Sequence, residues 1–271
     1  QLSFQKNDIY LTCLPIHHIG GLAIIFRALL YGFKIVLVDK FEKNDCINKI
    51  IHHKVTLTSF VPTMLSRIIK STQVDKLHKV LRGIILSGDH CNPTLIKSAL
   101  SKKINIYKSY GMTESCSGIS GFWVKNNMQH INSVGLPHDK VQFKIVKNKI
   151  LVKGPTIIDQ YYNDTQINNW YHTNDLGHIN NDGFLYVFGR GQQVISGGEN
   201  IDIQEVENII LSHPNIKQVF IKAANDDEWG HRIIAYINST NMDAIKMKDW
   251  LKTQIANYKI PKEFIFINDI D

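Results

Sequence analysis

The 271-residue chain has only four cysteines, no hydrophobic run long enough to span a membrane and no basic block longer than two residues. Cys13, Cys46, Cys91 and Cys116 are widely spaced and show no metal-ligand pattern, so we expect reduced thiols in a cytoplasmic protein. The longest apolar stretch, around residues 20–30, contains an arginine and is too short to cross a bilayer. The amino-terminal residues lack the basic start and apolar core of a signal peptide.

The absence of a basic block also limits what the formal net charge of +7 can mean. The lysines are scattered, with Lys102-Lys103 as the longest basic run, and no aromatic residues are interleaved as a stacking platform. We therefore expect no nucleic acid partner, and a nucleic-acid-binding module is only a third hypothesis. An anionic small-molecule substrate, or solubility alone, explains the charge better.

Hydrophobic residues make up 44% of the chain, which is enough for one large core and a smaller second one. Strand and helix signals alternate through the first half, which predicts an α/β fold with a parallel sheet and βαβ crossovers. Pro62 and the pair Asn92-Pro93 mark two helix starts, because proline in the first turn loses no hydrogen bond. The expected strands are 9–14, 34–38, 56–60, 80–86 and 104–107, and the other expected helices are 20–30 and 45–53.

The pattern changes after Gly135. Residues 141–146 and 149–153 predict a hairpin, and 184–188 predicts another strand of a small antiparallel sheet. Beyond a glycine-rich loop, helices are expected at 203–211 and 243–256, and strands at 218–223 and 233–237. This restart predicts a domain boundary at 189–191. A large domain would then cover 1–189, and a small α+β domain would cover 190–271.

Three separated segments carry residue types that a nucleotide site requires. Residues 109–115 (Ser-Tyr-Gly-Met-Thr-Glu-Ser) follow the expected strand at 104–107, and open α/β sheets bind ligands at the carboxyl ends of their strands. Residues 171–175 (Tyr-His-Thr-Asn-Asp) and the pair Gly189-Arg190 lie downstream. Together these segments offer an aromatic face, a hydroxyl, a carboxylate for a metal ion, an acid for a diol and an arginine.

These motifs, in this order, resemble the adenylate-forming superfamily of acyl-CoA synthetases, luciferases and peptide-synthetase adenylation domains. The resemblance covers essentially the whole chain. Within the superfamily, residues 14–22, 111–117 and 196–201 are most similar to the o-succinylbenzoate–CoA ligases of menaquinone synthesis. The resemblance implies an acid–thiol ligase that uses ATP and Mg²⁺ to make an acyl-adenylate, and then transfers the acyl group to coenzyme A. A rotation of the small domain would separate the two steps.

The resemblance also implies roles for individual residues at the nucleotide. Tyr110 would stack on adenine, Thr113 would donate to phosphate oxygens, and Glu114 would hold Mg²⁺. Asp175 would accept from the ribose hydroxyls. The remaining nucleotide-binding positions are Gly88, Asp89, Ser109, Gly111, Met112 and Arg190. Each residue also has an ordinary structural interpretation: a rim tyrosine, a solvated loop acid, a turn aspartate or a surface arginine.

The acyl pocket and the coenzyme A tunnel are implied in the same way. His18 would lie at the mouth of the acyl pocket as a catalytic position together with Thr113 and Glu114, and Gly20 and Gly21 would leave room for the substrate. Ser115 would line the pocket, although a turn role is equally consistent with its position. Gly197, Gly198 and Glu199 would line the coenzyme A tunnel. Glu205 and Glu207, on the following helix, are expected to form a solvated face.

The chain departs from the family pattern at several positions. The phosphate-binding loop and the terminal lysine motif are absent, and there is no initiator methionine, so we expect a central and carboxyl-terminal fragment that is inactive or impaired in adenylation by itself. Ser87-Gly88-Asp89 replaces Gly-Gly-Ala, and Asn174 replaces a glycine in Thr-Gly-Asp. The hinge is one residue short and carries Gln193.

Two alternatives therefore accompany the leading hypothesis. The chain could come from a ligase for another aryl or medium-chain acid, or it could be a degenerate, non-catalytic nucleotide-binding remnant. The sequence leaves open whether the protein forms a homo-oligomer.

Overall fold

The computed structural model describes residues 2–89, 91–162, 167, 169–190, 193–196, 199–226 and 230–267. The chain divides into two compact units. Unit 1 comprises Gln1–Thr173 and Gly177–Val187, and unit 2 comprises Asn174–Leu176 and Phe188–Asp271. In the described part of the chain, every helix is too short or too polar to cross a bilayer.

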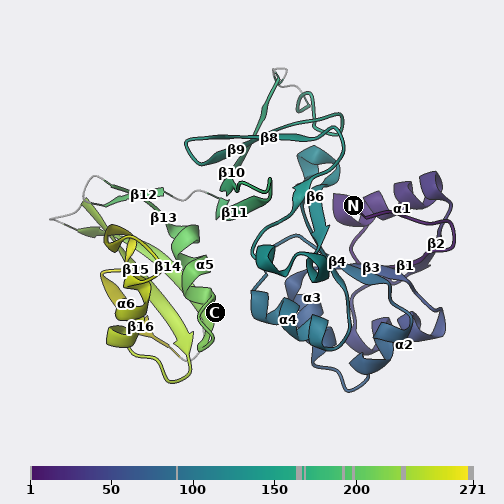
Figure 1. Ribbon diagram of the computed structural model, residues 1–271, viewed down its shortest axis with the longest axis horizontal. Helices are drawn as coiled ribbons and strands as arrows, with labels where there is room; N and C mark the ends of the chain where they lie inside the picture. Colours follow the sequence, from purple (N-terminus) through teal and green to yellow (C-terminus); the bar gives the residue numbers. More distant parts are fainter. Residues whose placement is uncertain are drawn as a thin grey trace. The chain divides into compact units, whose positions relative to one another are not determined.

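Unit 1 is built on a seven-stranded sheet with the order β2-β1-β3-β4-β5-β6-β7 (Figure 1). The first five strands run parallel, whereas β6 and β7 are antiparallel to their neighbours. The strands are β1 (Ile9–Thr12), β2 (Lys34–Leu37), β3 (Leu57–Phe60), β4 (Gly83–Leu86), β5 (Ile106–Met112), β6 (Ser117–Trp123) and β7 (Leu136–Pro137). The parallel sheet is confirmed, and the two antiparallel strands are an addition to the prediction.

Helices α1 (Ile19–Tyr31), α2 (Lys43–His52), α3 (Pro62–Ile69) and α4 (Pro93–Ser101) connect the parallel strands. Helix α4 begins as the sequence predicts, because the Asn92 side chain accepts from the Thr94 amide at 2.8 Å and Pro93 occupies the first turn. Helix α1 is capped after Tyr31 by Gly32, which has a left-handed φ of 72° and whose amide donates to the Ala28 carbonyl.

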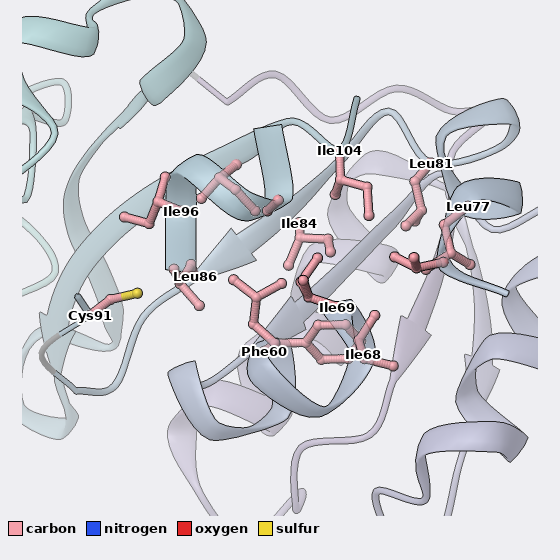
Figure 2. Close-up of a cluster of buried hydrophobic side chains, with 14 of the residues drawn as sticks. Phe60, Ile68, Ile69, Leu77, Leu81, Ile84, Leu86, Cys91, Ile96 and Ile104 are labelled. Atoms are coloured by element: carbon pink, nitrogen blue, oxygen red, sulfur yellow. The ribbon is translucent and has the colours of Figure 1, made fainter. Parts of the chain in front are cut away.

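The central strands of this sheet are buried on both faces. Ile84 and Leu86 belong to a cluster that includes Phe60 and Ile96, and Figure 2 shows these side chains between the sheet and its helices. Ile85, between them in sequence, belongs to a second cluster on the opposite face. Alternate side chains of a strand point to opposite faces, so a strand buried on both sides is apolar throughout. This explains why β4 is recognisable in the sequence.

A second, antiparallel sheet has the order β11-β10-β9-β8. The predicted hairpin is present as β8 (Gln142–Val146) and β9 (Lys149–Lys153). Lys147 and Asn148 connect them with positive φ angles of 49° and 62°, the conformation favoured in two-residue hairpin loops. Strand β11 (Leu185–Arg190) was also predicted, whereas β10 (Tyr171–Ile179) was not.

Unit 2 has the α+β composition that the sequence predicts. Its three-stranded sheet has the order β14 (Ile216–Asp226), β15 (Gly230–Ser239) and β16 (Glu263–Phe266), and a separate hairpin consists of β12 (Gln193–Ser196) and β13 (Glu199–Asp202). Helices α5 (Ile203–Leu211) and α6 (Ala244–Lys252) contribute Val206, Ile210 and Met247 to the core. The glycine-rich segment expected as a loop thus contains two paired strands, and β16 was not predicted.

Candidate functional site

Three of the predicted site segments follow parallel strands of the same sheet. The segment with His18 follows β1, the turn Ser87-Gly88-Asp89 follows β4, and Thr113-Glu114 follows β5. Parallel strands place their carboxyl ends at one edge of a sheet, the edge where open α/β sheets bind ligands. Unit 1 therefore gathers these segments at a single edge.

The position of the central motif needs a correction. We predicted a strand at 104–107 with the motif in the loop after it, but β5 extends to Met112. Residues 109–112 therefore lie on the strand, and only Thr113–Ser115 form the short 3-10 turn that follows. The reason is strand β6, which pairs antiparallel with β5 from Tyr107 to Met112. Its small residues (Ser117, Gly118, Ser120 and Gly121) gave no strand signal in the sequence.

Gly111 is required by the close approach of β6. A side chain at this position would overlap the Ser117 carbonyl and lie within 2.7 Å of the Gly118 Cα. The pairing register shifts between Tyr110 and Gly111, as in a β-bulge. Bulges re-aim side chains near functional sites, and here the bulge lies between the predicted adenine residue and the predicted metal ligand.

The turn after Glu114 is held by Ser115, which is almost fully buried. Its hydroxyl accepts from the Met112 amide at 2.9 Å and lies 2.7 Å from the Ser117 carbonyl oxygen, to which it can donate. The next two residues, Cys116 and Ser117, have left-handed φ angles of 53° and 91°. Ser115 thus has the turn role that the sequence left open, and strained backbone of this kind clusters at functional sites.

The carboxylate of Glu114 has a tyrosine partner that the sequence did not predict. The Tyr161 hydroxyl donates to Glu114 Oε1 at 2.9 Å, and the Tyr171 hydroxyl lies 2.8 Å from the Tyr161 hydroxyl. A phenol is neutral at pH 7, so Tyr161 holds the proton that it donates to Glu114. These contacts span 47 and 10 residues and carry no sequence signal.

Tyr110 is half-buried and packs against a small cluster of Ile119, Val141 and Val152. Ser109, its neighbour, donates to the Ser120 carbonyl at 2.8 Å across the β5–β6 pair. Met112 also packs against the cluster, while Thr113 is exposed. An adenine-stacking role for Tyr110 stays a prediction, and the structure supplies a rigid support for its ring.

The Ser87-Gly88-Asp89 turn is exposed at Gly88 and Asp89. Gly88 has a left-handed φ of 94°, and a Cβ atom there would lie 3.1 Å from the Val61 side chain. Glycine is therefore needed at this position for its backbone, and the acid follows on an exposed turn. A nucleotide-binding role for Gly88 and Asp89 remains predicted.

His18 is the exposed amino-terminal cap residue of α1, and its ring lies 4.5 Å from that of His17. Its carbonyl accepts from the amides of Gly21 and Leu22 at 3.0 Å. A Cβ atom on Gly21 would overlap the Pro15 carbonyl, so the space beside Gly21 is filled by the chain's own backbone. At Gly20 such a Cβ would be in ordinary van der Waals contact with the Leu14 side chain at 3.5 Å, so room for a ligand stays a prediction at Gly20.

Asp175 is buried within β10. Asn174, just before it, has a φ of 61°, and the left-handed region is one that asparagine enters more readily than most residues. Asparagine in place of the family glycine is therefore compatible with this backbone conformation. Arg190 ends β11 and Glu199 is exposed at the start of β13, while Gly197 and Gly198 lie outside the described residues.

Glu205 and Glu207 do not form the predicted solvated face. Both Glu205 carboxylate oxygens lie 2.7 Å from the Lys259 ammonium. Glu207 accepts from the Ile221 amide at 2.7 Å, and burial raises its pKa. The prediction was wrong because the carboxylates bind β14 and the segment before β16, which lie far along the chain.

A second buried group that the sequence did not single out is Lys108, on β5. Its ammonium donates to the Ile131 carbonyl at 3.0 Å, and burial lowers its pKa to about 8. In the sequence, Lys108 is recognisable only as a residue of the run that leads to Tyr110, two positions later. The hydrogen bond links β5 to the segment before β7.

The donor set suits a hard metal ion bound together with phosphate. No group of three or more His, Cys, Asp or Glu side chains able to hold a metal ion occurs among the described residues. Mg²⁺ is usually bound by one or two carboxylates with phosphate oxygens and water, and not by an all-protein cage. A single half-buried carboxylate, Glu114, fits that pattern.

The comparisons agree with this arrangement. The AMP-binding enzyme family model matches residues 1–162, and the AMP-binding enzyme C-terminal domain model matches 205–271. The 2-succinylbenzoate–CoA ligase of Bacillus licheniformis is 35% identical over 285 aligned residues, covering 98% of this chain. The corresponding Bacillus subtilis ligase is 34% identical over the same share.

Solved structures give the same result. The o-succinylbenzoate CoA synthetase from Bacillus subtilis, in complex with its acyl-adenylate intermediate, matches 100% of this chain with a TM-score of 0.87 and 33% identity. The same enzyme in complex with ATP and magnesium ion matches with a TM-score of 0.86. The chain spans only 59% of the length of the B. licheniformis relative. Because the first family model alone covers more than half of its residues, the chain belongs to the family of AMP-binding enzymes.

Proposed function

We propose that this chain is the central and carboxyl-terminal part of an ATP-dependent acyl-CoA ligase that activates 2-succinylbenzoate for menaquinone synthesis. The observation that carries the proposal is the match of the whole chain to the Bacillus subtilis synthetase in complex with the acyl-adenylate OSB-AMP. The gathering of His18, Asp89 and Glu114 at one edge of the sheet in unit 1 supports it. All four cysteines are free, which supports a cytoplasmic location.

In this proposal the protein mainly positions the reactants. Tyr110 stacks on adenine and is backed by its apolar cluster, and Asp175 accepts from the ribose hydroxyls. Thr113, exposed on the turn after β5, donates to the phosphate. Glu114 would hold Mg²⁺, which when bound neutralises charge on the phosphate oxygens. His18 lies beside the acyl group at the mouth of its pocket.

The transfer to coenzyme A uses the second part of the chain. We assign a large domain to 1–189 and a small domain to 190–271, with Gly197, Gly198 and Glu199 along the pantetheine path. Unit 2 resumes at Phe188, two residues before the proposed boundary, and Gly189, with a φ of 130°, packs against the Gln204 side chain within that unit. Asn208 also donates to the Phe188 carbonyl at 2.6 Å.

Ligand-induced stabilisation of the chain tests the substrate. Hydrolysis-resistant adenylate analogues of 2-succinylbenzoate, benzoate and a medium-chain acid would be compared with AMP by thermal unfolding. We expect the 2-succinylbenzoyl analogue to raise the unfolding temperature most. A larger shift with another analogue would reassign the acid. A shift with AMP that no acyl-adenylate analogue exceeds would favour the non-catalytic nucleotide-binding remnant, and the absence of any shift would contradict the proposal.

A further inference from the structure

The hydrogen bonds around Glu114 point to a role for a tyrosine outside every motif named above. We propose that Tyr161 is a positioning residue that orients the Glu114 carboxylate for a divalent cation, with Tyr171 supporting it from behind. The inference rests on the proposed function, because it takes Glu114 as the metal ligand. It deepens that function by adding the contact that fixes the ligand's side chain.

The direction of the hydrogen bonds follows from their chemistry. An ionised carboxylate only accepts, so the single Tyr161 proton is directed at Glu114 Oε1, 2.9 Å away. The Tyr161 oxygen must then accept from Tyr171, whose hydroxyl is 2.8 Å away. The chain of donors runs from Tyr171 to Tyr161 to Glu114. Each bond polarises the next, so Tyr171 strengthens the donation that reaches the carboxylate.

The main chain around Glu114 is already fixed by other contacts. The Ile158 amide donates to the Glu114 carbonyl at 2.7 Å, which ties the segment before Tyr161 to the turn. Ser115 closes the same turn through Met112 and Ser117. The Tyr171 ring packs against the cluster of Ile119, Val141 and Val152. The freedom that remains is in the Glu114 side chain, and the Tyr161 hydroxyl restrains it.

This arrangement assigns the two carboxylate oxygens to different tasks. Oε1 accepts from Tyr161, and in this proposal Oε2 would be the oxygen that binds the cation. One oxygen per carboxylate suits Mg²⁺, which demands near-ideal octahedral geometry and retains waters. Hydrogen bonds from outer groups to metal ligands typically change metal affinity by about 10–100-fold.

Three substitutions in this chain test the proposal: Tyr161→Phe, Tyr162→Phe and Glu114→Gln. Tyr162 is the matched control, because it is the next residue and is 94% exposed. In metal-free protein, Tyr161→Phe should shift the resonance of the Glu114 carboxyl carbon, while Tyr162→Phe should leave it in place. In the presence of ATP, Mn²⁺ should broaden the amide resonances of residues 112–117. Tyr161→Phe should require about tenfold more Mn²⁺ for the same broadening.

The outcomes distinguish the metal-binding role of Glu114 from the positioning role of Tyr161. If Glu114→Gln abolishes the Mn²⁺ effect but Tyr161→Phe behaves like Tyr162→Phe, Glu114 binds the metal and the positioning role is rejected. If Glu114→Gln leaves the broadening unchanged, Glu114 is not the ligand, and the metal role and the positioning role both fail. Thermal unfolding of metal-free Tyr161→Phe should match that of the wild type, since only one exposed hydroxyl is removed.

Discussion

In unit 2, the Lys259 ammonium lies 2.7 Å from both carboxylate oxygens of Glu205. The two side chains are 20% and 22% exposed, so the pair is largely shielded from solvent. It connects helix α5 to the segment that leads into β16. These elements are separated by 54 residues, and the ion pair therefore closes unit 2 across most of its length.

Removal of this ion pair should destabilise unit 2. Lys259→Ala is expected to lower the free energy of unfolding by about 1–2 kcal/mol, between the values typical of exposed and of buried pairs. The matched control is Lys252→Ala, which breaks a pair with Asp249 of similar length, 2.8 Å, whose side chains are 50% and 64% exposed. Urea unfolding should show that the control substitution lowers the free energy of unfolding by less than about 0.5 kcal/mol. Equal effects in both variants would contradict the role of burial.

Lys108 should make stability depend on pH. Burial lowers its pKa from 10.5 to about 8, so between these values the unfolded chain binds a proton that the folded chain does not. Stability should therefore increase as the pH rises from 8 toward 10.5, by at most about 3 kcal/mol, and should be lost as the pH falls through 8. Cys91 and Tyr10, whose pKa values are raised from 9.0 to about 11 and from 10.0 to about 12, keep protons that the unfolded chain loses, so they oppose part of this rise above about pH 9 and pH 10.

Substitution of Lys108 by methionine checks this assignment. Lys108→Met removes the buried charge, so the rise in unfolding free energy between pH 8 and pH 10 should largely disappear. Lys97→Met, at an exposed position on α4, should retain the wild-type dependence. If the free energy of unfolding rises with pH equally steeply in Lys108→Met and in the wild type, a group other than Lys108 causes the rise.

Gly111→Ala tests the close contact between β5 and β6. The added methyl group would overlap the Ser117 carbonyl, so the bulge must open, at a cost of about 3 kcal/mol. Gly20→Ala is the control, because its Cβ would have no neighbour closer than 3.5 Å. Denaturant unfolding of both variants measures the difference. A Gly111→Ala protein as stable as Gly20→Ala would mean that the strands are not this close.

Asn174 tests the backbone conformation next to Asp175. Its φ of 61° is costly for a β-branched residue, so Asn174→Val should lose about 1–2 kcal/mol. Asn174→Gly restores the residue of the family pattern and should stay within about 1 kcal/mol of the wild type. Thermal unfolding distinguishes the two. Destabilisation by glycine as large as by valine would show that the Asn174 side chain, and not its backbone, matters.

Elements with strong local signals could be predicted from the sequence. Helix α5 has the predicted limits of 203–211, because Asp202 caps it and its apolar residues recur on one face. The hairpin at β8–β9 likewise follows from alternation around Lys147-Asn148. Strand β6 has no such pattern, because it contains serines and glycines, whose small size permits the close approach to β5.

The residues of the candidate site show the same difference between local sequence signals and long-range contacts. The motif residues Tyr110, Glu114 and Asp175 could be named from local sequence, since each stands inside a recognisable run. Tyr161 could not be paired with Glu114, because a contact across 47 residues depends on how β5 and the second sheet pack. The paired state of Glu205 was missed for the same reason.

The most direct measurement is a crystal structure of this chain with a hydrolysis-resistant 2-succinylbenzoyl-adenylate. We predict adenine against the Tyr110 ring, the ribose hydroxyls on the Asp175 carboxylate and the acyl group next to His18. An adenosine bound elsewhere, or a ligand that contacts Tyr110 but leaves Asp175 out of reach, would contradict this prediction.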